Sequence, residues 1–471
     1  MAAAIALATT GSLPDAARAQ PADDICAGAS PTSAFCVGQQ KLAEAAAAEC
    51  KRLGRPASQC TLPIGHQVGD DIARNYQRTW LHRAAAFQYR LGDPVSFDSA
   101  QWLGTHNSFN SVNDSPTASH TDSNQQLSLT EQLDVDVRAL ELDLHYIPSA
   151  AAGGAKAVVV CHGRGPDQAN AGCTNEPLFS QVLPRIANWL KQPARKREVI
   201  LLYLEDELKD PAGYAQTVQQ LDNVLRGPGG KSLIYKPSQS KFTSKGCANL
   251  PLGLDREDVR ERGAQVVLVG NCRSGWASDV FGWDNVHLES GSTPKYRPFP
   301  GCDATYSRSD YRTKLVRYYE DSTFVSAAID PTSTPAEHNA DRLTPPRVSA
   351  MTRCGVNLFG FDQLLPGDGR IDASIWSGAP GEPNAARGHC AFQRADGRWV
   401  ARACVAKRRA ACHSARGWSL TRTAVYYHRA PAACRARHAR FDVPRTGEEN
   451  SLLRRAAGKT GVWLHYRLPP A

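Results

Sequence analysis

The sequence lacks any uncharged apolar run of 18 or more residues, so no helix is expected to span a bilayer. It has no internal repeat, no low-complexity tract and no C-x-x-C pair, which excludes solenoid, fibrous and zinc-finger proteins. Hydrophobic residues make up 42% and charged residues 21% of the 471 positions. This composition excludes a wholly disordered chain, and the length allows two or three globular domains.

Cysteine, in contrast, is abundant. There are 14 cysteines between Cys26 and Cys434, which predict up to seven disulfides in an oxidising compartment. Residues 1–19 are small and apolar, with an A-x-A-like cleavage site at residues 17–19, although the usual basic start is missing. We therefore expect a signal peptide and a secreted or extracytoplasmic protein. A merely alanine-rich terminus is the alternative.

Charge is distributed unevenly along the chain. Residues 387–471 hold 18 Lys and Arg but 4 Asp and Glu, a net charge of +14, which leaves −5 of the total +9 for residues 1–386. A basic tail suggests peripheral contact with an anionic membrane or an envelope polymer, and solvated surface is the alternative. No nucleic-acid partner is expected, because no recognition motif accompanies the charge.

The pattern of elements divides the chain into four segments. A helical extension stapled by disulfides among Cys26, Cys36, Cys50 and Cys60 is expected in residues 20–94, from the helix-like segments 32–53 and 70–91. Six short β-prone runs follow, at 102–103, 139–147, 157–161, 199–204, 266–269 and 356–361. Helix-like segments at 179–191 and 212–225 separate some of them.

Strands alternating with helices predict an α/β fold with a (β/α)8 TIM-type barrel over residues 95–370. Residues 371–471 have no long periodic helix and are rich in Gly, Pro, Arg, Trp and Cys. They predict a small disulfide-rich module of β or irregular structure.

The segment RALELDLHYI, residues 138–147, is the most informative strand. Alternation places three leucines on one face and Glu141, Asp143 and His145 on the other. A strand of a parallel barrel is buried on both faces, so these carboxylates need a compensating cation or hydrogen-bond donors. A divalent cation with oxygen ligands would supply that compensation. In an antiparallel sheet the same residues would simply face water.

Three more segments carry polar residues at strand ends, where barrel enzymes keep their catalytic groups. GTHNSF (104–109) contains His106 and Asn107, AVVVCHG (157–163) contains His162, and VILLYLED (199–206) contains Glu205. A lone histidine is more often structural, but two histidines and three carboxylates at strand ends indicate a site.

These motifs, with EQLDVDVRALELD between the first and second, resemble the catalytic barrel of phosphoinositide-specific phospholipase C (PI-PLC). The metal-independent bacterial branch of that family has Asp after the first histidine and a catalytic arginine near the end of the second strand. Asn107 and Glu141-Leu142-Asp143 make this chain more similar to the calcium-dependent branch.

The resemblance implies roles for the motif residues. His106 would donate to the phosphoryl oxygen, and His162 would act as general acid toward the leaving glycerol oxygen. Ca²⁺, or alternatively Mg²⁺, would be bound by Asn107, Glu141, Asp143 and Glu205. Glu141 or Glu205 would be the general base for the inositol 2-hydroxyl, giving diacylglycerol and a cyclic inositol phosphate.

Other residues are less clearly assigned. Lys245, Arg273 and Arg370 are candidate phosphate or headgroup contacts, with ordinary surface charge as the alternative. Asp362 is a candidate to orient His106 or to make a structural hydrogen bond. No role is expected for His145.

The tail resembles half of a C-type lectin domain through Glu382-Pro383-Asn384, Trp399 and nearby cysteines. Val400 and Ala401 replace the usual oxygen ligands after the tryptophan, which predicts a structural remnant or a module that does not bind calcium.

The overall expectation is a secreted phosphodiesterase that cleaves phosphatidylinositol-type lipids. Two alternatives remain: a metal-dependent glycerophosphodiester phosphodiesterase or sphingomyelinase D-like enzyme, and a catalytically silent barrel that binds glycans or envelope polymers.

Overall fold

The computed structural model describes residues 71–111, 113–114, 124–162, 173, 176–291, 296–302, 306–307, 309–320 and 343–467. The predicted signal peptide, the helix at 32–53, the four cysteines from Cys26 to Cys60, and Gly163 lie outside these residues. Within the described part of the chain, every helix is too short or too polar to cross a membrane.

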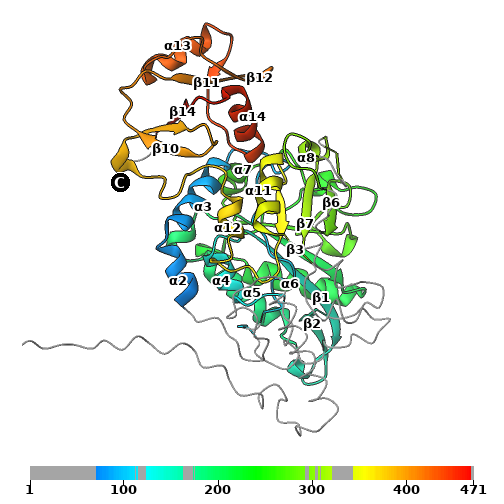
Figure 1. Cartoon of the computed structure of the whole chain (residues 1–471). Coiled ribbons are helices and arrows are strands. Elements are labelled where there is room, and N and C mark those ends of the chain that lie inside the picture. Colours follow the sequence, from blue (N-terminus) through cyan, green and yellow to red (C-terminus); the bar gives the residue numbers. More distant parts are fainter. Residues whose placement is uncertain are drawn as a thin grey trace, which may run out of the picture. The chain divides into compact units, whose positions relative to one another are not determined.

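The largest sheet is built around strand β1 (Ala139–Pro148). β1 pairs in parallel with β3 (Ile200–Glu207), and β4 (Val266–Gly270) and β5 (Phe281–Gly282) extend the sheet in the order β2-β1-β3-β4-β5. A second, parallel sheet has the order β6-β7-β8 (His287–Gly291, Leu315–Tyr319 and Leu358–Gly360). Figure 1 shows β1, β3 and β7 in one region of the fold, flanked by helices.

Residues 102–105 connect the two sheets through isolated parallel bridges from Trp102 to Leu358 and from Gly104 to Ala139. Gly104 is required there, because a Cβ at this position would lie 2.3 Å from the Phe359 carbonyl oxygen. No pairing among the described residues joins β5 to β6. The fold is mixed α/β, as predicted, but the predicted closed barrel is not formed. The reason is that β5 is only two residues long and is the last strand of the first sheet.

Strand β2 (Lys156–Val160) corrects a second expectation. It was predicted as a parallel barrel strand, but it pairs antiparallel with β1, with Val160 opposite Leu144. Only seven residues connect β1 to β2, too few for the crossover that parallel strands need. The two strands therefore form a hairpin.

Helices cover the sheets and bury their apolar faces. Leu140, Leu142 and Leu144 are each at most 1% exposed and share one core with α4, α5 and α6. The helices predicted at 179–191 and 212–225 are confirmed as α5 (Phe179–Leu190) and α6 (Pro211–Val224). The remaining helices of this region are α2 (Asp71–Gln77), α3 (Trp80–Leu91), α4 (Leu129–Asp134), α7 (Arg256–Glu261), α8 (Asp310–Thr313), α11 (Pro345–Cys354) and α12 (Arg370–Ser374).

The C-terminal module forms its own sheet, in the order β10-β9-β14-β11-β12, with β13 paired to β11. Its strands are β9 (Cys390–Gln393), β10 (Trp399–Arg402), β11 (Arg409–Ser414), β12 (Gly417–Leu420), β13 (Arg440–Phe441) and β14 (Val462–Arg467). Its helices are α13 (Ala430–Arg435) and α14 (Gly447–Ala457). The expectation of no long helix is wrong at α14, where Thr446 caps the N-terminus and Arg454 and Arg455 occupy the last turn.

Disulfides are present as predicted, and all ten described cysteines are paired. The bonds are Cys161–Cys173, Cys247–Cys272, Cys302–Cys354, Cys390–Cys404 and Cys412–Cys434. Their number is compatible with an extracytoplasmic location.

Helix α3 is joined to the start of the C-terminal module by the buried amide of Gln88. Its nitrogen donates to the Ser374 carbonyl at 2.9 Å, and its oxygen accepts from the Trp376 amide at 2.8 Å. We predict that Gln88→Ala lowers the free energy of unfolding by about 3 kcal/mol, because it leaves buried backbone groups without partners. Urea denaturation measures this loss. The exposed Gln239→Ala is the control, and an equal effect of both would contradict the assignment.

Candidate active site

Strands β1 and β3 place three carboxylates on one side of the sheet. Glu141 and Asp143 are 2% and 6% exposed, and the parallel register sets Asp143 directly opposite Glu205. Carboxylate oxygens of Glu141, Asp143 and Glu205 all lie within 4.8 Å of one another. The alternation seen in the sequence thus produces a buried cluster of like charge.

The loop that carries His106 and Asn107 is held against this cluster by buried polar groups. Gln132 of α4 accepts from the Thr105 hydroxyl at 2.7 Å and donates to the Ser108 carbonyl at 2.8 Å. Asn107 has a φ of 43°, a left-handed conformation that asparagine tolerates better than most residues. Its backbone amide donates to the Glu141 carboxylate at 2.9 Å.

The donor set fits a hard cation. Oxygens bound to Ca²⁺ at about 2.3–2.6 Å lie at most about 5 Å apart, which agrees with the spacing of the three carboxylates. The end of the Asn107 side-chain amide lies 3.1 and 3.3 Å from the two Asp143 oxygens. In one amide orientation its nitrogen donates to Asp143, and in the other its oxygen joins the carboxylates as a fourth potential ligand.

Arg317 of β7 is a part of the site that the sequence analysis missed. Its guanidinium is buried and forms ion pairs with Glu141 at 2.5 Å and with Glu289 of β6 at 3.0 Å. It also lies over the rings of Tyr203 and Tyr319, at 5.4 and 5.0 Å from their centroids. The β-prone run LVRYY around Arg317 is a signal that could have revealed β7.

The charges of the cluster are only partly compensated. Burial, reinforced by Glu205 and Glu141, raises the pKa of Asp143 well above its ordinary value. Burial and Glu141 together raise the pKa of Glu205 to about 7. Burial would also raise the pKa of Glu289, but Arg317 and His287 outweigh it and lower this pKa to about 2. Arg317 thus compensates the negative charge of Glu141 and Glu289, but it leaves the repulsion between Asp143 and Glu205 uncompensated.

His106 is paired with Asp362. Its Nδ1 lies 3.1 Å from an Asp362 oxygen, and Asn124 donates to the same oxygen at 3.0 Å. Burial alone would lower the pKa of His106, but Asp362 and Glu141 raise it to about 9. The candidate contact between Asp362 and His106 is therefore formed.

Asp362 is held in turn by a buried ion pair. The Asp362 backbone amide donates to Glu320 at 2.7 Å, and Arg370 pairs with the same Glu320 oxygen at 2.5 Å. Arg370 is 5% exposed and also pairs with Asp368 at 2.7 Å. It is therefore neither a surface charge nor an open headgroup contact, but a buried support for the segment that carries Asp362.

His162 lies just beyond β2, and its side chain is exposed. The preceding residue, Cys161, donates its backbone amide to the Asp143 carbonyl at 3.2 Å. His162 is therefore one residue beyond the point where the chain after β2 is bonded to β1, the strand that carries Glu141 and Asp143. His145 is buried beside Cys161 and Cys173, but their sulfurs are joined in a disulfide and cannot form a metal site with it.

The roles of the two predicted substrate contacts, Lys245 and Arg273, stay predictions. Lys245 is exposed in the loop before Cys247. Arg273 is half-exposed and pairs at 3.2 Å with Asp206, which faces the other side of β3 from Glu205.

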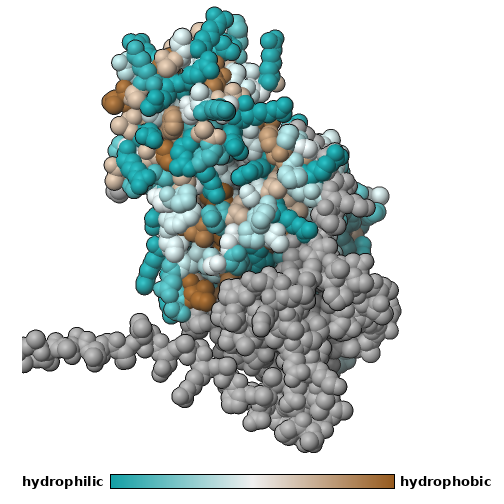
Figure 2. Space-filling model, viewed as in Figure 1, coloured by the Kyte–Doolittle hydropathy of each residue, from teal (hydrophilic) through white to brown (hydrophobic). Residues whose placement is uncertain are grey.

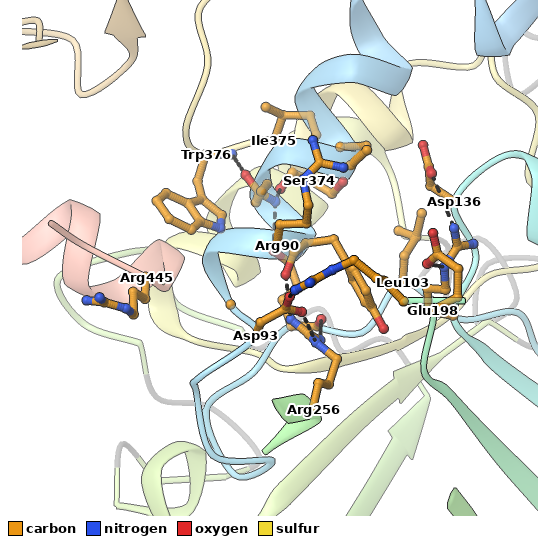
Figure 3. Close-up of a pocket in the computed structure, with 18 of the residues that line it drawn as sticks. Arg90, Asp93, Leu103, Asp136, Glu198, Arg256, Ser374, Ile375, Trp376 and Arg445 are labelled. Atoms are coloured by element: carbon orange, nitrogen blue, oxygen red, sulfur yellow. Dashed lines mark hydrogen bonds and ion pairs between the residues drawn. The ribbon is translucent and has the colours of Figure 1, made fainter. Parts of the chain in front are cut away.

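A separate cavity of about 320 Å³ lies at the opposite ends of the strands. Figure 3 labels Glu198 among the residues that line it. The lining also includes Arg138, and these two residues lie two positions before β3 and one position before β1. Arg138 pairs with Glu198 at 2.7 Å, and Arg256 lies 3.4 Å from Asp93. The Arg138–Glu198 pair thus compensates charge at the N-terminal ends of β1 and β3, and the Arg256–Asp93 pair does so between the start of α7 and the loop after α3.

In the tail, Glu382 of the lectin-like motif is 2% exposed. Its carboxylate accepts from the Asn384 backbone amide at 2.6 Å and pairs with Arg387 at 3.3 Å. The Glu382 oxygens are thus bound by groups of the same short segment. The likeness to a lectin remains a prediction.

Comparison with known proteins identifies the family to which this chain belongs. The family model described as the Rv2075c PI-PLC-like domain matches residues 61–368. The uncharacterised protein Rv2075c of Mycobacterium tuberculosis H37Rv is 56% identical over 443 residues, which cover 94% of this chain and 91% of that protein.

Two solved structures are more distantly similar. A phosphatidylinositol-specific phospholipase C from Listeria monocytogenes has 17% identity and a TM-score of 0.40, with 62% of this chain and 98% of that chain covered. A calcium-dependent phosphoinositol-specific phospholipase C from Pseudomonas sp. has 14% identity and a TM-score of 0.30, with 57% and 91% covered. The family match and the 56% identical relative show that the chain belongs to the Rv2075c PI-PLC-like domain family.

Proposed function

We propose that this protein is a calcium-dependent phosphodiesterase that cleaves phosphatidylinositol-type lipids to diacylglycerol and a cyclic inositol phosphate. The observation that carries the proposal is the convergence of Glu141, Asp143 and Glu205 within 4.8 Å, beside the His106–Asp362 pair. Family membership supports a phosphodiesterase, and the buried oxygen cluster supports a hard cation.

Asn107, Glu141, Asp143 and Glu205 would hold the ion. When bound, Ca²⁺ would neutralise the carboxylates, attract a phosphoryl oxygen and lower the pKa of a nearby hydroxyl. Arg317 carries a single positive charge and is shared between Glu141 and Glu289, so within the described part of the chain Asp143 and Glu205 form no ion pair of their own. This imbalance supports a divalent ion in addition to Arg317.

Different residues of the protein would accept the proton of the attacking hydroxyl and protonate the leaving group. The 2-hydroxyl of inositol attacks phosphorus, its proton passes to a carboxylate, and the bond from phosphorus to the glycerol oxygen breaks. The arrangement favours Glu205 over Glu141 as the base, because Glu141 already accepts from Arg317 and from the Asn107 amide. Holding nucleophile and phosphate in one molecule removes much of the entropic barrier.

The two histidines would act on the phosphate and the leaving group. With Nδ1 of His106 directed to Asp362, its Nε2 can donate to a phosphoryl oxygen. His162 would protonate the departing glycerol oxygen, and its exposed position suits a leaving group that stays in a lipid layer. Water would then open the cyclic product in a second step.

Calcium binding can be tested without activity. We expect Ca²⁺ at about 100 times its Kd to stabilise the wild-type protein by about 2.7 kcal/mol, seen as a rise in Tm of several degrees. Asp143→Asn should raise the Ca²⁺ concentration needed for this shift. Asp206→Asn, on the opposite face of β3, is the matched control and should respond as the wild type does. Calorimetric titration that finds no Ca²⁺ binding to the wild type would reject the metal site.

The catalytic roles can be tested on phosphatidylinositol dispersed in detergent micelles, with products identified by ³¹P NMR. His106→Ala and His162→Ala should each lower kcat by about 10²–10⁴-fold while Ca²⁺ binding stays nearly unchanged. Lys459→Ala, at an exposed position of the C-terminal module, is the control and should retain activity.

The same assay separates the alternatives. Hydrolysis of glycerophosphoinositol or sphingomyelin without any cyclic inositol phosphate would favour the other metal-dependent phosphodiesterases. No hydrolysis of any of the three substrates, together with glycan binding, would favour a catalytically silent binding protein. Full activity after exhaustive chelation would reject the role of the metal.

A further inference from the structure

The C-terminal module exposes two large hydrophobic side chains, on two loops that pair with each other. In the described part of the chain, Val405 and Tyr426 are the exposed large hydrophobic residues, at 78% and 42%. Their two loops are joined by paired backbone hydrogen bonds between Arg408 and Val425, at 2.9 and 2.8 Å. Most of the coloured surface in Figure 2 is hydrophilic, so such exposure is uncommon on this molecule.

Three exposed cations, Arg402, Lys407 and Arg408, lie within three residues of Val405 in the chain. The Lys407 ammonium lies 5.1 Å from the Tyr426 ring centroid, and the guanidinium groups of Arg402 and Arg408 lie 5.6 and 6.0 Å from that of Phe392. We call Arg402, Val405, Lys407, Arg408 and Tyr426 the interfacial patch. None of its three cations forms an ion pair with another described residue, so their charge is available to an external anion.

A disulfide and aromatic packing hold the two loops of the patch against the core of the C-terminal module. Cys404, next to Val405, is bonded to Cys390 at the start of β9. Phe392 packs edge-to-face on Trp463 at 5.5 Å, and Tyr427 packs on the same Trp463 at 5.7 Å. Because the two loops are fixed by this core, keeping Val405 and Tyr426 in an external apolar layer would require little further ordering.

We propose that the interfacial patch docks the protein on anionic phospholipid bilayers, with Val405 and Tyr426 entering the headgroup region and the three cations binding lipid phosphates. Tyrosine is favoured at membrane interfaces, and a cation near an anionic leaflet strengthens binding about fivefold. An anionic polysaccharide or nucleic acid would bind the cations but would leave Val405 without an apolar partner. The apolar pair therefore favours a membrane.

The test uses the full chain and co-sedimentation with vesicles of phosphatidylcholine containing phosphatidylglycerol. These vesicles contain no inositol lipid, so the outcome is independent of the proposed catalytic function. We expect binding to the mixed vesicles and little binding to phosphatidylcholine alone. The triple variant Arg402→Gln/Lys407→Gln/Arg408→Gln should bind about 100-fold more weakly.

Two comparisons make the test specific. Arg416→Gln/Arg435→Gln/Arg437→Gln removes the same charge from exposed positions elsewhere in the module and should retain most of the binding. Val405→Ser/Tyr426→Ser keeps the charge and should weaken vesicle binding about tenfold or more, from the lost apolar burial, while leaving binding to heparin unchanged. Circular dichroism confirms that each variant is folded.

Three outcomes would overturn the proposal. Equal loss in the two charge variants would show attraction by net charge alone. Unchanged vesicle binding in the Val405→Ser/Tyr426→Ser variant would show that nothing enters the bilayer and would favour a soluble polyanion. Absence of binding of the wild type to the mixed vesicles would reject membrane docking outright.

Discussion

The burial of like charge beside one guanidinium is the constraint on which the site depends. Glu141, Asp143 and Glu205 are brought together because two parallel strands share a register, and Arg317 faces them from a second sheet. Buried carboxylates of this kind strongly disfavour the folded state unless they are paired. Since Arg317 is divided between Glu141 and Glu289, its charge anchors one side of the cluster and leaves the other side open to a ligand of opposite charge.

The surroundings of the cluster are organised to keep these groups in place. Gln132 fixes the loop before β1, and the Arg370–Glu320 pair fixes the segment that presents Asp362 to His106. Each support is buried and makes several hydrogen bonds, so a change at one of them leaves unpaired groups in the interior. These supporting residues therefore determine where His106 and Asn107 can lie. The register of the strands places the carboxylates, and the buried supports place the other side chains of the site around them.

Much of the site could be predicted from the sequence, but only where a strand has a clear period. Glu141 and Asp143 alternate with buried leucines, and Glu205 ends an apolar run, so their shared face follows from geometry. Arg317 and Glu289 were missed because HLESG has no apolar run and because the β-prone LVRYY was not counted as a strand. The direction of β2 was also readable, since a seven-residue connection permits only a hairpin. The failure of β5 and β6 to pair depends on tertiary packing and leaves no local signal.

The uneven charge of the chain supports the docking role that we propose for the tail. The part of the chain before residue 387 is net negative, and its cluster holds carboxylates in excess of Arg317, so without a bound cation its charge disfavours approach to an anionic lipid layer. The tail carries the opposite charge, and Arg402, Lys407 and Arg408, close to Val405 in the chain, form no ion pair with another described residue. Under these two proposals, cations of the tail would attract the protein to an anionic lipid layer, and a cation bound at the carboxylate cluster would attract the anionic phosphodiester, so two parts of the chain would meet the same negative charge by different means.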